Sequence, residues 1–163
     1  MPALVALANT TLGSNSTTIT FSSIPGTYQD LYLVVVGRSS GGFWQNIRFN
    51  GDSGANYNVL RFTATGSTIA SGVAAAATRG LISDLSFNSS VTGAAFIHIL
   101  DYARSDKHKT TIGDVHANNG YSNEMLCNRW ANTAAITTVA LSSDSGQTYL
   151  AGTTFALYGV RGS

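Results

Sequence analysis

The feature that most constrains the fold is a run of six consecutive apolar residues, Leu31–Val36, which follows a Pro25-Gly26 pair. The run is rich in β-branched residues and too short for an independent helix, so it predicts a central strand covered on both faces. Proline fixes φ and glycine accepts a positive φ. Ile24–Thr27 therefore predicts a tight turn, with type II as the candidate type, between this strand and the preceding segment Ile19–Phe21.

Other short apolar or alternating segments follow, separated by turn-forming clusters at intervals of about 8–12 residues. We expect further strands over 4–7, 17–21, 44–49, 57–62, 81–87, 94–102, 109–116, 121–131, 135–141 and 153–160. The segment Thr63–Thr78 is rich in Gly, Ser and Ala, and we expect a loop with at most one helical turn at Val73–Ala77. Two apolar strands far apart in sequence, Leu31–Val36 and Phe96–Leu100, imply two packed sheets that share one core. The sequence predicts an all-β fold, a two-sheet antiparallel β-sandwich, and favours a jelly roll.

Composition limits the classes of partner. The chain has 163 residues, which suits a single domain over 1–163. Charged residues make up 10% of the chain and the formal net charge is +1, so we expect no nucleic acid and no anionic membrane as partner. The apolar start of the chain makes 1–16 a candidate extended N-terminal arm. Its first residues, Met1–Leu7, would then pair with the sheet edge of a neighbouring molecule, and the alternative is an ordinary first strand of the domain.

Two sequence patterns suggest chemistry but also suit plain turns. Gly51-Asp52-Ser53-Gly54 matches the nucleophile tetrapeptide of chymotrypsin-like proteases, but all three histidines follow this serine, so a hairpin turn is the stronger interpretation. Asn50, Asp52 and Asn56 offer oxygen ligands for Ca²⁺, yet only one of them is a carboxylate. Side chains that bind the backbone of their own turn are the preferred interpretation.

Histidine and cysteine give weak signals. Asp106–His108 and Asp114–His116 repeat an Asp-x-His spacing that would place both side chains on one face of a strand, as a zinc site requires, although a solvated polar strand and loop is preferred. His98 lies in an apolar strand and suits a hydrogen-bonded core residue or an interface between subunits. Cys127 is alone and suits a small buried hydrophobic residue. We predict no metal, no cofactor and no catalytic residue.

Aromatic side chains allow a sugar-binding surface. Five of them, in a protein with no clear catalytic set, would form a stacking platform for a glycan: Phe43, Trp44, Tyr57, Tyr121 and Trp130. Core packing is the alternative and the default for aromatic residues in a β protein of this size.

Four segments carry a resemblance to a known class of proteins. Thr17–Leu31, Ile47–Tyr57, Trp130–Thr137 and Thr154–Val160 resemble, in order and spacing, segments of small virion structural proteins of tailed bacteriophages. The resemblance covers nearly the whole chain except Ala64–Ser90. It implies a jelly-roll-like domain in a virion, made in the host bacterial cytoplasm and placed on the capsid surface.

The resemblance also implies a function and partners. It suggests a capsid decoration (cement) protein that is no enzyme, forms a homotrimer and binds the major capsid protein; a tail or fibre protein that binds a host glycan is the alternative. The expected partner interface combines the apolar N-terminal segment with exposed aromatic residues: Leu4, Val5, Leu7, Phe43, Trp44, Tyr57 and Tyr121. A free carbohydrate-binding module or hydrolase is the third and weakest interpretation.

Overall fold

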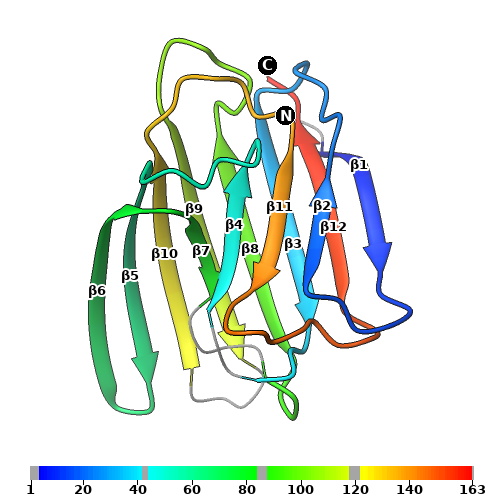
Figure 1. The fold of residues 1–163 in the computed structure, drawn as a ribbon, viewed down its shortest axis with the longest axis vertical. Helices are drawn as coiled ribbons and strands as arrows, with labels where there is room; N and C mark the ends of the chain where they lie inside the picture. Colours follow the sequence, from blue (N-terminus) through cyan, green and yellow to red (C-terminus); the bar gives the residue numbers. More distant parts are fainter. Residues whose placement is uncertain (1–3, 42–43, 84–87, 118–121, 163) are drawn as a thin grey trace.

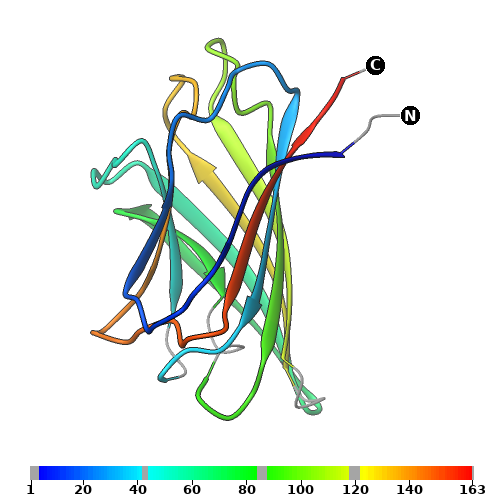
Figure 2. The same ribbon diagram turned by 90° about the vertical axis from the view of Figure 1, so that its right-hand side faces the viewer.

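The computed structural model describes residues 4–41, 44–83, 88–117 and 122–162. It confirms the predicted two-sheet antiparallel β-sandwich, and the described residues form strands, turns and loops without a helix (Figures 1 and 2). The strands are β1 Leu4–Thr11, β2 Thr18–Phe21, β3 Asp30–Gly37, β4 Gln45–Phe49, β5 Tyr57–Thr65, β6 Thr68–Ala77, β7 Gly80–Ser83, β8 Gly93–Leu100, β9 Lys109–Ala117, β10 Ser122–Trp130, β11 Val139–Ser143 and β12 Thr154–Val160.

The two sheets have different sizes. The large sheet has eight strands in the order β1-β12-β3-β8-β9-β10-β5-β6, and the small sheet has four in the order β2-β11-β4-β7. The chain passes repeatedly from one sheet to the other, and its two ends pair in nested fashion, β1 with β12 and β2 with β11. This wrapped arrangement is jelly-roll-like. The β5–β6 hairpin extends the large sheet on one side, at the left of Figure 1.

The core lies between the sheets, and the expected double coverage of the central strand is wrong. Leu31, Leu33 and Val35 are fully buried against the small sheet. The alternate positions of β3 face the other way: Val34 is half-buried and Val36 is 38% exposed. Among the described residues no layer covers that outer face, so an apolar run here marks a central strand with one covered face.

The expected loop over Thr63–Thr78 is also wrong. Strand β5 runs on to Thr65, and β6 returns antiparallel to it from Thr68 to Ala77. Gly66 has φ +59° at the first turn position, which is the residue that a two-residue type II′ hairpin requires. Small side chains on β6 hide the alternation that identifies a strand, which is why Val73–Ala77 resembled a helical turn.

Two local expectations near the N-terminal half need revision. The Pro25-Gly26 turn exists, with the Tyr102 hydroxyl donating to the Pro25 carbonyl oxygen, but Gly26 does not adopt a positive φ and the turn is not type II. The positive φ falls on Ser23, at +55°. Residues 4–11 form β1, an edge strand paired with β12 of the same chain, which is the alternative to a detached arm.

Candidate interaction surfaces

The outer face of the large sheet carries an unusual number of exposed apolar side chains. Its register places Val73, Leu60, Cys127, Ile112 and His98 in one row across five strands, from β6 to β8. The exposed large apolar residues of this face belong to six strands and are Val36, Leu60, Phe62, Ile69, Val73, Phe96, Ile112 and Met125. We call these eight residues and the strand surface between them the outer face. Several exposed apolar side chains on one face of a sheet typically mark an interaction site.

Polar groups also lie on this face: Asp114 is opposite both Phe96 and Met125 in the register, and His98 belongs to the row described above. His98 contacts Asp30 across the β8–β3 pair, with 3.1 Å between Nε2 and Oδ2, and its ring lies 5.4 Å from the ring of Tyr32. Asp30 is 8% exposed and also accepts a hydrogen bond from the backbone N–H of Asp101. His98 is therefore half-buried on the outer face and held by a buried carboxylate, rather than packed in the core.

The predicted interface residues fall into different places. Leu4, the first residue of β1, is 61% exposed. Val5 and Leu7 are half-buried, and Leu7 packs against the core. Trp44 is 41% exposed, just before β4. Phe43 and Tyr121 lie outside the described residues.

Tyr57 does not belong to an exposed surface, so its assignment to the partner interface is wrong. It is fully buried, burial raises the pKa of its hydroxyl to about 12, and that oxygen accepts a hydrogen bond from the backbone N–H of Phe49. Trp130 is 1% exposed and stacks on Tyr57, with Phe49 as the third ring. Of the three members of the predicted aromatic platform that the structure describes, two therefore belong to the core and only Trp44 is exposed.

Trp44 instead forms one wall of a groove under the β5–β6 hairpin. The groove has a volume of about 360 Å³, and its lining includes Trp44, Val59, Arg61, Gly72, Ala74 and Arg79. The guanidinium carbons of Arg61 and Arg79 lie 5.7 and 5.9 Å from the centroid of the Trp44 ring, within the range of cation–π contacts. Arg79 is anchored by Asp144, with 2.6 Å between Nη2 and Oδ2. An exposed ring beside two arginines is a surface on which a sugar ring can stack.

The polar sequence patterns resolve into local bonds. Asp114 and His116 do meet, 3.0 Å apart, but the second ring nitrogen of His116 contacts Asn123. In the other pair, Asp106 binds Arg104 and His108 binds Arg129. Across the ranges that the structure describes, no three His, Cys, Asp or Glu side chains are placed to share a metal ion.

The Gly51–Gly54 segment is a structural turn, as the preferred interpretation has it. Asp52 accepts hydrogen bonds from the backbone N–H of Gly54, at 2.8 Å, and from the side chain of Asn56, at 2.9 Å. Its Oδ2 also accepts a 2.7 Å bond from Nε1 of Trp130. Asn50 binds the backbone of the segment around Thr137. These side chains tie the turn to the buried aromatic cluster.

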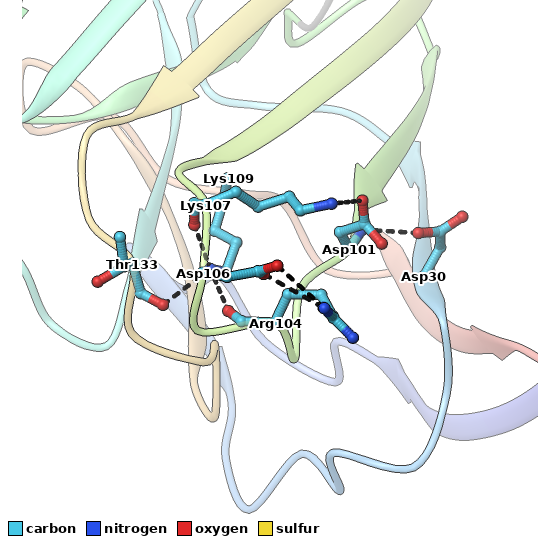
Figure 3. A network of polar contacts seen from close by, with 7 residues as sticks. All are labelled: Asp30, Asp101, Arg104, Asp106, Lys107, Lys109 and Thr133. Atoms are coloured by element: carbon cyan, nitrogen blue, oxygen red, sulfur yellow. Dashed lines mark hydrogen bonds and ion pairs between the residues drawn. The ribbon is translucent and has the colours of Figure 1, made fainter.

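A buried lysine has no counterpart among the sequence predictions. Lys109 is fully buried at the start of β9, and its Nζ donates to the backbone carbonyl oxygens of Arg104, Lys107 and Thr133 (Figure 3). Burial lowers the pKa of the ammonium group below its ordinary value, and the charges of nearby Asp106 and Asp101 offset only part of this effect. The lysine joins the β8–β9 loop to the segment after β10, so its role is to hold the two loops at one end of the sandwich.

Comparisons with known proteins add little. No protein-family model matches the chain, and no curated protein matches it. Among solved structures, the alginate lyase Aly36B is 11% identical with a TM-score of 0.34, over 98% of this chain and 78% of that one. The PL-14 alginate lyase from Aplysia kurodai is 8% identical with a TM-score of 0.31, over 98% and 80%. Likeness at this level carries no argument about activity. Within the described residues there is also no helix long and apolar enough to cross a membrane.

Proposed function

We propose that this protein is a structural virion protein of a tailed bacteriophage, a capsid decoration protein that binds the lattice of the major capsid protein. The four segments that resemble small virion proteins support the class. The observation that carries the proposal is the outer face, because a structural protein of a virion needs a broad contact surface rather than a catalytic cleft. The proposed location is the capsid surface.

The size of the outer face suits such a role. Eight strands of seven to ten residues make up the sheet. At about 4.8 Å between strands and about 3.4 Å per residue, they present a face of roughly 1,100 Å². A standard protein–protein interface buries about 800 Å² on each partner. The apolar side chains of this face would contribute the binding free energy, and the low surface charge would leave few ions to desolvate.

Electron cryomicroscopy of the phage particle tests the location. We expect many copies of this β-sandwich on the head, at repeated positions over the capsid lattice. A few copies at the tail tip would remove the decoration role and leave the tail-associated one.

A charge-insertion pair tests the surface. In Val36→Lys with Leu60→Lys, two lysines enter exposed positions of the outer face that have no acidic residue opposite them. We expect co-sedimentation with capsids to weaken at least about 100-fold, because each added ammonium group in an apolar contact must lose its water without gaining a partner. The control carries the same added charge on the small sheet, at the exposed positions Thr18 and Thr20 of β2. Loss of attachment in the control alone would place the contact on the other sheet and overturn the assignment of the outer face.

The second candidate function is glycan binding by a tail-associated protein, and the groove beside Trp44 favours it. Under this proposal a sugar ring stacks on the exposed indole. We expect a glycan array to identify a ligand, and Trp44→Ala to weaken its binding about tenfold or more, as measured by titration calorimetry. The control is Phe62→Ala, which removes an exposed aromatic ring on the outer face. A ligand that binds Trp44→Ala as tightly as the parent protein would exclude this groove.

A further inference from the structure

Strand β6 forms an edge of the large sheet with no feature that blocks pairing along its first seven residues. On the side away from β5, none of the described residues pairs with it. Its sequence, Thr68–Ala77, contains no charged residue and no proline, and Ile69 and Val73 are 82% and 77% exposed. Natural proteins guard exposed edges with charges, prolines, bulges or a covering segment. An unguarded apolar edge therefore indicates a strand that is covered by another chain.

The backbone of β6 is ready for such pairing. Its register with β5 is regular from Thr65↔Thr68 to Val59↔Ala74. In a two-residue hairpin the closing pair is hydrogen-bonded, and the bonded and non-bonded pairs then alternate. Ile69, Ser71 and Val73 consequently direct their N–H and C=O groups away from β5. These three residues present a row of donors and acceptors along the free edge.

We propose that β6 pairs antiparallel with β6 of a second copy of this chain, about a two-fold axis at Ser71. In this register Ser71 lies opposite Ser71, and Ile69 lies opposite Val73 of the second copy. The row is self-complementary: each copy supplies the donors that the other accepts, in about six hydrogen bonds. The exposed Ile and Val side chains meet as cross-strand pairs on the outer face. A contact between identical surfaces of this kind closes on itself as a dimer.

The opposite edge of the sheet is a poorer partner. Strand β1 has a register shift between Ala6 and Ala8 where it pairs with β12. Such a bulge bends a strand and interrupts the regular row of edge groups. Pairing of β6 with β1 of the next copy would also produce a ring or filament rather than a closed pair. The geometry thus favours two copies, in place of the three that the family resemblance implies.

The pairing region is short, which sets the expected strength. Seven residues from Thr68 to Ala74 extend about 24 Å at about 3.4 Å per residue. This edge is smaller than the contact of about 800 Å² per partner in standard complexes. We therefore expect a dimer that forms with rising concentration in the micromolar range, and that is favoured further where copies are crowded together.

Sedimentation equilibrium of the purified protein tests this pairing independently of any capsid, so its outcome is separate from that of the proposed function. The mass should rise with concentration from 17.0 kDa to twice that value. Ser71→Pro removes an N–H that faces the free edge while sparing the bonds to β5, and it should weaken association at least about tenfold. Ile69→Lys with Val73→Lys should also weaken association, because lysines of the two copies would face and repel each other across the contact. Ala6→Lys, on β1, should associate like the parent.

Cross-linking tests the register. In a Cys127→Ser background, Ser71→Cys places two thiols opposite each other across the axis, about 5.5 Å apart at their Cα atoms. A short bismaleimide should link the copies at this position far faster than at Ala6→Cys on β1. A parent protein that stays at 17.0 kDa throughout the micromolar range would overturn the proposal. So would a limiting mass of three copies, or association lost in Ala6→Lys but kept in Ser71→Pro.

Discussion

Replacement of Lys109 by methionine should lower the free energy of unfolding by about 3–5 kcal/mol, because three backbone carbonyl oxygens lose the buried ammonium group that they bind. Methionine is of similar length and fills the same space, so the effect isolates the hydrogen bonds rather than a cavity. Urea unfolding followed by tryptophan fluorescence measures it, since Trp130 is directly opposite Lys109 in the β9–β10 pair.

The matched control is Lys107→Met. Its ammonium group is about half exposed and pairs with the partly exposed Asp101. Exposed ion pairs contribute about 0–1 kcal/mol, so we expect a change within that range. Equal effects of the two substitutions would contradict the role assigned to Lys109. Hydrogen exchange should also show faster exchange in the β8–β9 loop of Lys109→Met than in the control.

Replacement of Asp52 by alanine should destabilise the protein by about 2–4 kcal/mol. The change leaves Nε1–H of the buried Trp130 without its acceptor and removes the bonds that close the Gly51–Gly54 turn. Thermal or urea unfolding measures the loss. A double-mutant cycle with Trp130→Phe separates the indole bond from the turn, and we expect the two effects to be less than additive. Full additivity would show that the Asp52–Trp130 bond contributes nothing.

The carboxylate of Asp52 also makes the stability of the protein depend on pH. Burial raises the pKa of Asp52, but hydrogen bonds from Trp130, Asn56 and Gly54 outweigh it and lower the pKa below its ordinary value. A folded-state pKa below the unfolded one means that the contribution is fully present above the unfolded value of about 3.9. It is lost as the pH falls through the folded-state pKa. The stability difference between the parent and Asp52→Ala should therefore shrink on acidification below about pH 4.

Local sequence patterns predicted most of the strands. The β-branched run Leu31–Val36 became β3, and the turn residues of Gly51–Gly54 form the turn that they predict, because both depend on preferences within a few residues. The same reasoning missed β6, since Ala, Ser and Gly have no strong alternation to reveal a strand. It also could not identify β6 as the proposed dimer edge, because an edge strand can be recognised only from the order of the strands in the sheet.

The chain by itself determined the class of fold: short β-branched and alternating segments between strong turns can bury their apolar faces only in packed sheets. The tertiary structure alone decided which apolar residues are core. Leu33 and Val34 are neighbours of the same chemical type, yet one is fully buried and the other faces the uncovered side of the sheet. It also placed Tyr57 and Lys109 inside and Trp44 at a groove. Burial depends on which distant strand lies across the core, and no local preference carries that information.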